Sequence, residues 1–599
     1  MIYHCEDHTC NYWDEGEKLP ERCPQCGRKL LRANEADMTG DDWTALGNTL
    51  WDAEASDKKR MVDCFRKAAY LGSAWGVCNL GICMEQGNGV EADPVQAFWL
   101  YQQAVEMGSL NAVCCLGVCY QYGIGTAPDA KQAAELYCKA AKYGSPRGQM
   151  LLARAFHDGI GVEADAAEAV HWVRAAAYQR YGEGMHRLGV CYACGDGVEQ
   201  NWEHAVHWFR EAAESGVSAA MTDLGCCYEK GCGVEQSWEQ AFSWYRRGAE
   251  CGNPVSMSNL GLCYQRGYGV EQNWQEAIKW YEQGAQCGDL QSMHNLACCY
   301  ERGEGVEQNE DRAFYWYRRS AEGGHGGAMC NLGRCYKRGY GVEQNWQEAV
   351  KWYERGAQCG NLQSMHNLAC CYERGEGVKQ NMTEAIRWYT AAAEGGNADD
   401  MYNLGWQYDH GEGVEQDMKK AICWYERAAE QNYPAAMNSL GECYAMGRGV
   451  PRDLETAMEW YRRAAELGEA MADYNMGWHL EQAGKLSEAY AHYRKAADGN
   501  DDSAWWALGR FYENGVVVAQ DGKEARRCYE TGEKLGSVKC KMRLARCKLL
   551  GIGGRRAKKA GLDLCRQALE LAKESSEKED YGYEAEMNLL RRTIAENES

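Results

Sequence analysis

The sequence predicts an all-α fold, a solenoid of stacked two-helix repeats, with a small separate module at its N-terminus. Three observations support this prediction. A leucine recurs every 36 residues, a pair of glycines follows most of these leucines, and apolar residues lie at helical spacing on both sides of the glycines. One helical pair cannot bury its apolar side alone, whereas in a stack each pair completes the core of its neighbour.

The recurring leucine, called the register leucine below, defines the repeats. It advances in steps of 36 residues through Leu80, Leu116, Leu152, Leu188, Leu224, Leu260, Leu296, Leu332, Leu368, Leu404 and Leu440. Met476 continues the series, Leu508 follows after 32 residues, and Leu544 restores the step of 36. Leu46 belongs to a divergent first repeat without the glycine turn. These positions predict about fifteen repeats.

The segment LQSMHNLACCYERGEGV occurs twice, as Leu290–Val306 and as Leu362–Val378. The surrounding stretches, Gly267–Asn309 and Gly339–Asn381, differ at only four positions. A duplicated pair of repeats explains both observations. We therefore interpret the segment as a building block of the architecture and not as a catalytic or binding cassette in two copies.

Each repeat is predicted to consist of a helix, a glycine turn, a second helix and a second glycine turn. In one first helix the apolar stripe consists of Leu296, Ala297, Cys299 and Tyr300. Gly303 is expected to end that helix at positive φ, and Gly305 to permit a second unusual backbone angle. The preceding second helix is expected to start after Asn273, with Glu276 completing a capping box, and to stop at Gly288. Its apolar positions are Ala277, Ile278, Trp280, Tyr281 and Ala285.

The repeating pattern LGxxYxxGxGVxxDxxxAxxWYxxAAExG resembles the Sel1-like repeats, relatives of the tetratricopeptide repeats, over roughly residues 75–555. The resemblance implies a right-handed α-solenoid that serves as a scaffold or adaptor, in bacterial signalling and host interaction or in eukaryotic protein quality control. The stretch Met476–Leu486 departs from the pattern, because MGWHLEQAGKL lacks the GxG turn and resembles an ordinary tetratricopeptide turn.

The N-terminal module carries four cysteines in CEDHTCNYWDEGEKLPERCPQCGRKLLRAN. Cys5, Cys10, Cys23 and Cys26 are expected to hold one structural zinc ion, since four thiols within reach of one another suit tetrahedral zinc. The first spacing is wide, so His8 is an alternative ligand to Cys10. A module of about 30 residues cannot build a core, and metal binding would supply its folding energy. It resembles a zinc ribbon or a rubredoxin-like knuckle, with redox iron or a nucleic-acid-binding ribbon as alternatives.

The predicted domain organisation follows from these features. Residues 1–35 form the zinc ribbon, 36–75 the divergent first repeat, 76–555 the Sel1-like solenoid and 556–599 the C-terminal closing helices. In the last segment, Leu562–Lys573 and Tyr583–Asn597 are expected to be helices whose charged sides suit a solvent-facing cap.

Cysteine and tryptophan recur at fixed positions. Cysteine stands three residues after the register position at Cys83, Cys119, Cys191, Cys227, Cys263, Cys299, Cys335, Cys371, Cys443 and Cys547. We expect these cysteines to be small buried hydrophobes. The secreted cysteine-rich branch of the family carries a disulfide ladder, but its matching positions here are Ala285 and Met293, so no ladder is expected. Tryptophan stands twenty residues after the register leucine and is expected to be buried between repeats, at Trp172, Trp208, Trp244, Trp280, Trp316, Trp352, Trp388, Trp424 and Trp460.

No catalytic site is predicted. The motif Ser-x-x-Lys occurs only at Ser56–Lys59, without the Lys-Thr-Gly or Ser-Asp-Asn partner motifs of a β-lactam-type hydrolase. His294 and His366 recur because their repeat was duplicated, and no nucleophile is expected beside them. A hydrolase of the kind found in distant cysteine-rich family members is therefore only an alternative reading.

Composition and charge narrow the function classes. A net charge of −22 argues against general affinity for nucleic acid or anionic lipid. The chain has no apolar run of 18 residues, as a membrane-spanning helix would require. Its start, MIYHCEDHTC, has neither the basic residues nor the apolar segment of a signal peptide, so we expect a cytoplasmic protein with reduced thiols.

The predicted function is that of a non-enzymatic scaffold that binds a partner protein or an extended peptide along the concave face. In tetratricopeptide geometry the first helices line this face. Their exposed positions would be two before and two, five and six after the register leucine. The sixth position carries a basic row, which we expect to bind an acidic or extended peptide: Lys230, Arg266, Arg302, Arg338 and Arg374.

Asparagine recurs directly before the register leucine, as at Asn259, Asn295, Asn331 and Asn367, and its amides could bind a peptide backbone. In the alternative reading both rows are structural. The asparagines would then bond to neighbouring turns, and the bases would pair with Glu235, Glu271, Glu307, Glu343, Glu301 or Glu373, which contributes little stability. A second functional alternative is a nucleic-acid-associated regulatory protein that uses the zinc ribbon, the basic row and Arg555–Lys559.

Overall fold

The computed structural model describes residues 2–5, 13–15, 30–33, 35, 38–51, 55–578 and 584–598. It divides into two compact units, Met1–Asn309 and Glu310–Ser599, and each unit is described by itself. Unit 1 opens with three short strands, β1 (Ile2–Cys5), β2 (Trp13–Glu15) and β3 (Leu30–Ala33). They form an antiparallel sheet in the order β2-β1-β3, in which Tyr3 lies opposite Asp14 and Arg32.

Every other regular element in the described residues is helical. The helices of unit 1 are α1 (Gly40–Thr49), α2 (Ala55–Tyr70), α3 (Ala74–Gln86), α4 (Pro94–Glu106), α5 (Leu110–Tyr122), α6 (Ala130–Lys142), α7 (Pro146–Asp158), α8 (Ala166–Tyr178), α9 (Gly182–Cys194), α10 (Trp202–Glu214), α11 (Ser218–Lys230), α12 (Trp238–Glu250), α13 (Pro254–Arg266), α14 (Trp274–Gln286) and α15 (Leu290–Arg302).

Unit 2 continues the series. Its helices are α16 (Glu310–Glu322), α17 (Gly326–Arg338), α18 (Trp346–Gln358), α19 (Leu362–Arg374), α20 (Met382–Glu394), α21 (Ala398–His410), α22 (Met418–Glu430), α23 (Pro434–Met446), α24 (Leu454–Glu466), α25 (Ala470–Gln482), α26 (Leu486–Asp498), α27 (Asp502–Asn514), α28 (Gly522–Lys534), α29 (Val538–Leu550), α30 (Lys558–Lys578) and α31 (Glu584–Glu598). None of the described helices is both long and apolar enough to cross a membrane.

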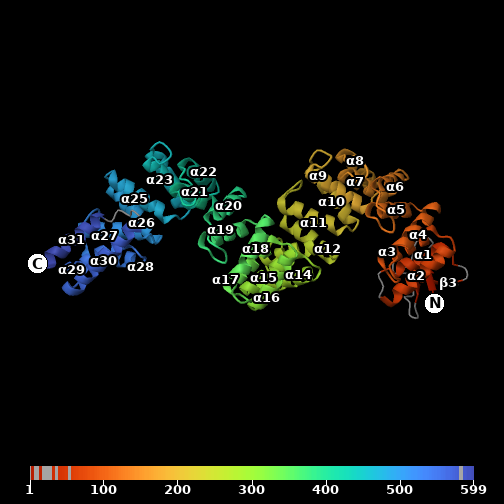
Figure 1. Ribbon diagram of the computed structural model, residues 1–599, viewed down its shortest axis with the longest axis horizontal. Helices are drawn as coiled ribbons and strands as arrows, with labels where there is room; N and C mark the ends of the chain where they lie inside the picture. The colour runs from red at the N-terminus through yellow and green to blue at the C-terminus, as the bar shows by residue number, and fades with distance from the viewer. Residues whose placement is uncertain are drawn as a thin grey trace. The chain divides into compact units, whose positions relative to one another are not determined.

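Consecutive helices pack in pairs, and the pairs stack in chain order within each unit (Figure 1). In unit 1 the pairs run from α1–α2 to α13–α14, and in unit 2 from α17–α18 to α29–α30. By the sequence period, α15 and α16 are the first and second helix of one further repeat. The prediction of an all-α solenoid of two-helix repeats is confirmed.

The first helices lie closer together than the second helices. Neighbouring first helices contact each other directly, as α5 does with α7, α13 with α15 and α17 with α19. Within the described parts of both units, no two second helices make contacts as extensive. The first helices therefore form the inner, concave side of the curve in each unit.

The helix ends follow the local sequence signals. Asn273 caps α14, because its Oδ1 accepts a hydrogen bond from the backbone amide of Glu276 at 3.1 Å. Gly303 ends α15 in the left-handed conformation at φ 70°, and Gly305 has φ 73°. The predicted helix ends and both positive φ angles are confirmed.

The two glycines of the GxG turn have different roles. A Cβ added to Gly159 would meet no atom closer than 3.6 Å, so this position needs glycine for its backbone conformation alone. A Cβ on Gly161 would lie 1.9 Å from the carbonyl oxygen of Ala130, the first residue of α6 in the preceding repeat. The second glycine is therefore the point where the turn touches the neighbouring helical pair.

The predicted cysteine positions are buried. All ten cysteines three residues after the register position are at most 3% exposed, and every cysteine from Cys64 to Cys565 is a free thiol. Burial raises the pKa of Cys83 to about 11 and that of Cys299 to about 12. The prediction that these residues act as small hydrophobes is confirmed.

The tryptophan prediction is wrong in one respect. Of the nine tryptophans only Trp244 is buried, and the others are half-buried on the second helices. The aromatic residue that fills the core is the tyrosine one position later, such as Tyr281 and Tyr425, which are at most 1% exposed. Several tryptophans instead carry an arginine over the indole ring, as Arg427 does over Trp424 at 4.3 Å.

In several repeats the buried tyrosine joins the two helices by a hydrogen bond. Tyr245 Oη donates to Glu229 at 2.5 Å, and Tyr281 Oη donates to Gln265 at 2.7 Å. The acceptor stands five residues after the register leucine, on the first helix. The glycine directly after the register leucine leaves room for the ring, since a Cβ on Gly261 would lie 2.5 Å from the ring of Tyr281.

At the C-terminal end, α31 packs against α29 and α30. Their shared core includes Met542, Cys565 and Leu590. Arg543 is held by Glu586 at 2.6 Å and by Glu513 at 3.3 Å, all three being largely buried. This ionic group fastens the last helix to the last regular repeat.

The metal prediction falls largely outside the described residues. Cys10, Cys23 and Cys26 lie outside them, as does His8, and of Cys5 only the backbone at the end of β1 is described. Among the described residues, no three His, Cys, Asp or Glu side chains converge as a metal site would require. The zinc ribbon and the domain boundaries remain predictions.

Candidate functional site

The candidate site is the first-helix face, defined here as the partly exposed side chains of the first helices from α3 to α29. The four positions expected to be exposed on this face differ from one another. The residue six after the register position is exposed in every repeat of this range, and the residues two and five after it are mostly half-buried. The position two before it is buried in several repeats, as at Cys78 and Thr222, because it packs between neighbouring first helices. The prediction that this position is exposed is therefore wrong for these repeats.

All five residues of the basic row are exposed, and each is the last residue of its helix. Lys230, Arg266 and Arg302 lie in unit 1, and Arg338 and Arg374 lie in unit 2. A cation at a helix C-terminus interacts favourably with the helix dipole, which gives the row a structural reason of its own. Arg302 lies 3.9 Å from Glu304, and within the described residues none of the five forms a salt bridge with the glutamates expected in the alternative reading.

The asparagines before the register leucine link neighbouring first helices. Asn367 Nδ2 on α19 donates to Cys330 Sγ on α17 at 3.3 Å. Asn475 on α25 donates to Asn438 on α23 at 3.0 Å, and the buried Asn79 on α3 donates to Asn48 on α1 at 2.8 Å. Asn295 accepts from Gln291 of its own helix at 2.9 Å. In these repeats the asparagine amides already have partners between or within first helices and not in a neighbouring turn.

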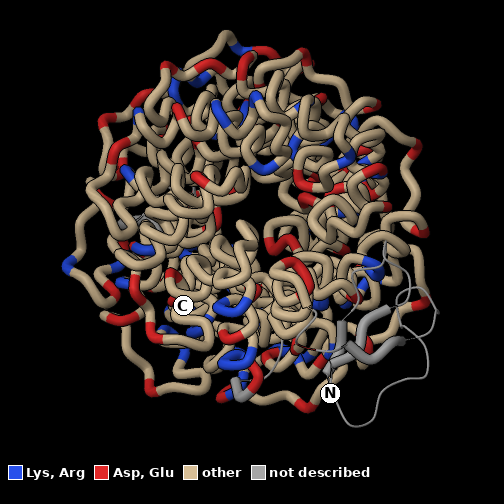
Figure 2. Tube along the Cα trace, turned by 90° about the vertical axis from the view of Figure 1, so that its right-hand side faces the viewer, with Lys and Arg blue, Asp and Glu red and all other residues tan. Residues whose placement is uncertain are grey.

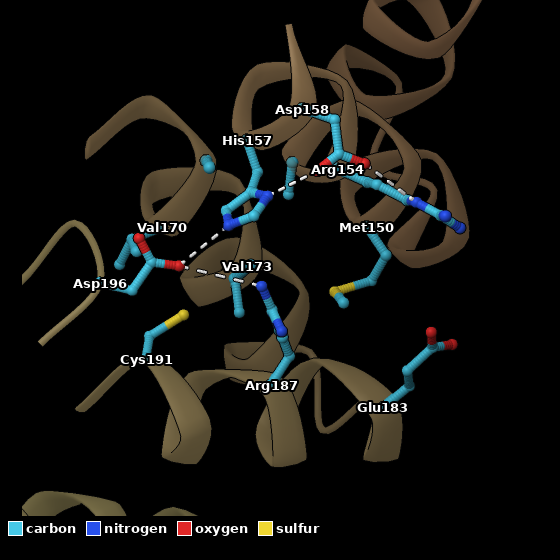
Figure 3. A pocket seen from close by; sticks show the side chains of 12 residues that line it. Met150, Arg154, His157, Asp158, Val170, Val173, Glu183, Arg187, Cys191 and Asp196 are labelled. Carbon is cyan, nitrogen blue, oxygen red and sulfur yellow. Dashed lines mark hydrogen bonds and ion pairs between the residues drawn. The ribbon is translucent and has the colours of Figure 1, made fainter. Parts of the chain in front are cut away.

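A pocket of about 350 Å3 opens on the first-helix face of unit 1. Its walls come from the first helices α7 and α9, its floor includes Val170 and Val173 of α8, and Asp196 of the following turn closes one side. The exposed Arg154 and Glu183 also line it (Figure 3).

Charged side chains of both signs surround the imidazole of His157 in this pocket. His157 Nδ1 lies 2.6 Å from Asp158, and His157 Nε2 lies 3.3 Å from Asp196 (Figure 3). Arg154 lies 3.3 Å from Asp158 and Arg187 lies 3.9 Å from Asp196. The hydrogen bond with His157 is the main cause that lowers the pKa of Asp158.

This chemistry suits binding better than catalysis. The pocket offers carboxylates, guanidinium groups and an apolar floor, which together can bind the polar backbone and mixed side chains of a peptide. The sequence did not reveal it, because Arg154, His157 and Asp158 stand at variable positions of the repeat pattern and recur in no other repeat as a group. Across the described chain, Lys and Arg are likewise interspersed with Asp and Glu (Figure 2).

The statement that no nucleophile lies beside the repeated histidines is wrong for His366. His366 Nε2 lies 3.6 Å from Cys370 Sγ, and His366 Nδ1 lies 2.7 Å from Asp400 of α21. The cysteine and the histidine are four residues apart on α19, so one helix presents both to the same side. In the duplicated segment the corresponding His294 Nε2 lies 3.9 Å from Cys298 Sγ.

Comparison with known proteins identifies the repeats. The Sel1 repeat family model matches residues 76–109, 112–145, 146–181, 182–217, 218–253, 254–289, 290–325, 327–361, 362–397, 398–433, 434–469, 470–501 and 504–537. A comparison with curated protein sequences gave no significant match.

A solved structure agrees with the family match. The chain is similar to c5321, a protective antigen present in uropathogenic Escherichia coli strains that displays an SLR fold. The identity is 32% over 75% of this chain and 97% of that one, with a TM-score of 0.50. It is also similar to a Sel1 repeat protein from Oxalobacter formigenes, with 33% identity over 41% of this chain and 96% of that one and a TM-score of 0.38. The chain belongs to the Sel1 repeat family.

Proposed function

We propose that this protein is a non-enzymatic cytoplasmic scaffold that binds a partner protein, or an extended peptide segment of one, along the first-helix face. The fold of stacked Sel1 repeats is typical of protein-interaction scaffolds, since it exposes a long surface made by many equivalent helices. The family alone does not specify a partner.

The observation that carries the proposal is the pocket between α7 and α9. It is open to solvent, it has an apolar floor, and its Arg154, Arg187 and Glu183 side chains can each bind a group of opposite charge or a backbone amide or carbonyl. The basic row adds one exposed cation per repeat, three of them in unit 1 and two in unit 2, which favours acidic segments on each unit.

A charge-reversal experiment tests the proposal. The row variant carries Arg302→Glu, Arg338→Glu and Arg374→Glu. The matched control carries three charge reversals at exposed second-helix residues, Arg246→Glu, Arg318→Glu and Arg387→Glu. Both variants change the net charge equally. The tagged proteins are used to capture partners from a native lysate, and the captured proteins are quantified by mass spectrometry.

We expect some proteins to be retained by the native chain and by the control but lost by the row variant. A second variant, Arg154→Glu with Arg187→Glu, tests the pocket in the same assay. Identical captured proteins for the native chain and both first-helix-face variants would reject the proposal.

Nucleic-acid binding is less well supported, because acidic residues outnumber basic ones and both signs are mixed along the chain (Figure 2). That alternative requires an affinity that falls steeply with salt, measurable by fluorescence anisotropy on a labelled oligonucleotide. The hydrolase alternative can be tested with a chromogenic β-lactam.

For the N-terminal module we propose a structural zinc site formed by Cys5, Cys10, Cys23 and Cys26. Four thiols are the donor set that tetrahedral zinc prefers. The purified chain is expected to contain one equivalent of zinc by elemental mass spectrometry, reduced by Cys23→Ser. Loss of zinc in His8→Ala but not in Cys10→Ser would identify His8 as the ligand instead.

A further inference from the structure

Four side chains from three helices meet next to the first-helix face of unit 2. His366 and Cys370 lie on α19, Tyr389 on α20 and Asp400 on α21. His366 lies between Asp400 and Cys370, 2.7 Å from Asp400 through Nδ1 and 3.6 Å from Cys370 through Nε2. Tyr389 Oη lies 3.3 Å from Cys370 Sγ and 3.0 Å from Glu373.

Asp400 is the unusual member of this group. Its side chain is fully buried, and its Oδ2 has no hydrogen-bond partner in the described structure. It stands at the third residue of α21, where the free amides of the helix N-terminus favour a negative charge. Burial raises the pKa of Asp400, the neighbouring Asp399 adds to this effect, and the hydrogen bond from His366 opposes it. A buried carboxylate of this kind requires a cationic partner, and His366 is that partner.

The pair keeps His366 protonated at neutral pH. The hydrogen bond to Asp400 is the main cause that raises the pKa of His366, to about 10, and the contact with Cys370 adds to it. A protonated imidazole therefore faces Cys370 Sγ. Burial alone would raise the pKa of Cys370, but the hydrogen bonds with His366 and Tyr389 outweigh burial and the charge of Glu373, so its pKa is lowered.

Cys370 is also accessible. It is half-buried, and 24% of the His366 side chain beside it is exposed. By contrast, its neighbour Cys371 is 1% exposed, and burial raises the pKa of Cys371 to about 11. The two adjacent thiols therefore differ in both conditions that govern thiol reactivity, the fraction of thiolate and access to it.

We propose that Cys370 is a nucleophilic thiol that exchanges with low-molecular-weight disulfides, which makes it a site of reversible modification on the first-helix face. The thiolate attacks one sulfur of the disulfide, so that a bond forms to Cys370 Sγ and the original sulfur–sulfur bond breaks. The leaving thiolate takes the electron pair of the broken bond and is protonated from solvent. Cys370 is oxidised to a mixed disulfide, and half of the small disulfide is reduced to a thiol. This proposal holds whether or not the scaffold function is correct.

The chain contains its own reference site. Cys298 and His294 belong to the identical seventeen-residue segment, but at the register position of Asp400 the following repeat carries Ala328. Asp400 is thus a sequence difference that lies in direct contact with the histidine of one copy. If the carboxylate activates the cysteine through the histidine, Cys370 should react and Cys298 should not.

The test is a site-resolved labelling experiment on the full chain. The reduced protein is treated at pH 7 with iodoacetamide or with oxidised glutathione, and labelling is followed over time by mass spectrometry. Trypsin releases Cys298 in the peptide 280–302 and Cys370 in the peptide 356–374, which differ in length, and fragment ions distinguish Cys370 from Cys371. Cys370 is expected to react at least about tenfold faster than Cys298, since each unit of pKa difference changes the thiolate fraction about tenfold below both pKa values.

Variants separate activation from simple exposure. Asp400→Asn should slow the reaction of Cys370 by about tenfold and move the pH at half-maximal rate upward. The matched control Asp399→Asn removes an exposed charge beside it and should leave the rate almost unchanged. Because Asp400→Asn could disturb the helix packing, Tyr389→Phe is measured as well. It keeps the ring and removes one hydrogen bond to Sγ, and it should also slow the reaction.

Thermal melting by circular dichroism accompanies each variant. Equal reaction rates for Cys370 and Cys298 in the native chain would overturn the proposal. So would an unchanged rate and pH profile in both Asp400→Asn and Tyr389→Phe.

Discussion

The clearest prediction concerns the two glycines of one GxG turn, Gly159 and Gly161. Both have positive φ, at 70° and 69°, so replacement by alanine imposes the same backbone strain, about 1–2 kcal/mol. The surroundings differ. A Cβ on Gly159 finds ordinary contact at 3.6 Å, whereas a Cβ on Gly161 would lie 1.9 Å from the carbonyl oxygen of Ala130.

The difference in stability follows from this geometry. Ordinary contact begins at 3.4 Å, so the Cβ of Gly161→Ala lies 3.4 − 1.9 = 1.5 Å too close to a backbone atom that cannot rotate away. The turn must move away from α6, and overpacking of this kind typically costs about 1–3 kcal/mol. We expect Gly159→Ala to lower the free energy of unfolding by about 1–2 kcal/mol and Gly161→Ala by about 2–5 kcal/mol.

A local measurement is needed, because long repeat arrays do not unfold in a single two-state step. Hydrogen exchange followed by mass spectrometry reports the opening free energy of peptides from α6, α7 and α8 separately. Gly161→Ala should accelerate exchange in α6 as well as in α7, whereas Gly159→Ala should affect mainly the end of α7. Equal effects of the two substitutions on α6 would refute the assignment of Gly161 as the contact between repeats.

Three other substitutions follow from the packing and the charges. Tyr425→Ala is expected to destabilise its repeat by about 3–5 kcal/mol and Trp424→Ala by clearly less, because the Tyr425 side chain is 1% exposed whereas the Trp424 indole is half-buried. Equal losses of stability for the two variants in calorimetry would contradict this order. Glu586→Ala removes the carboxylate nearer to the largely buried Arg543 and should lower the free energy of unfolding by about 3–5 kcal/mol. This loss should appear as faster proteolysis of α31, and an unchanged cleavage rate would show that the ion pair does not hold α31 in place. The contribution of His366 should depend on pH: its pKa is raised from 6.5 to about 10 in the folded state, so the stability it adds is complete below pH 6.5 and is lost as the pH rises through about 10. His366→Gln should therefore lower Tm at pH 6 and have little effect at pH 10.5, and a loss of Tm that does not change with pH would contradict the charged pair.

The repeats could be predicted from the sequence because their signals are local. Glycine at a helix end, asparagine at a helix start and a leucine every 36 residues each act within one or two turns of chain. Gly303 and Asn273 accordingly have the predicted backbone conformation and hydrogen bond. The N-terminal module has a spacing of cysteines that suits a metal site, but it occurs only once, so no second copy supports the assignment. The role of its cysteines as zinc ligands stays a prediction.

The choice between tryptophan and tyrosine as the core residue could not be made from the period. Both recur in nearly every repeat, one residue apart, so they point about 100° from each other around the second helix. Which of them faces inward depends on the angle at which the second helix packs on the first. The hydrogen bond from Tyr281 to Gln265 and the space above Gly261 resolve this choice, and both involve the facing helix.

The environment of Cys370 could not be predicted from its own repeat, because it depends on Asp400 in the next repeat. The sequence nevertheless contained a signal that marks Asp400 as unusual. The position four before the register leucine holds glycine, alanine or serine in the preceding regular repeats from Gly76 to Ser364. Among the repeats from Leu80 to Leu544, it holds aspartate only at Asp400. This position is buried, as Ser292 and Ser364 show. An acid at a buried small-residue position indicates a specific partner.

The contact made by the second turn glycine bears on how such chains change length over evolution. Gly305 packs against Trp274 and Gly377 packs against Trp346, so both duplicated turns dock onto the same type of residue. Unequal crossing-over within the identical segments would delete or add a block of two repeats, and each junction would still join a glycine to a tryptophan. The array can thus gain or lose whole blocks of two repeats while the packing at each junction between repeats is kept. The length of the protein therefore becomes a trait that selection can adjust.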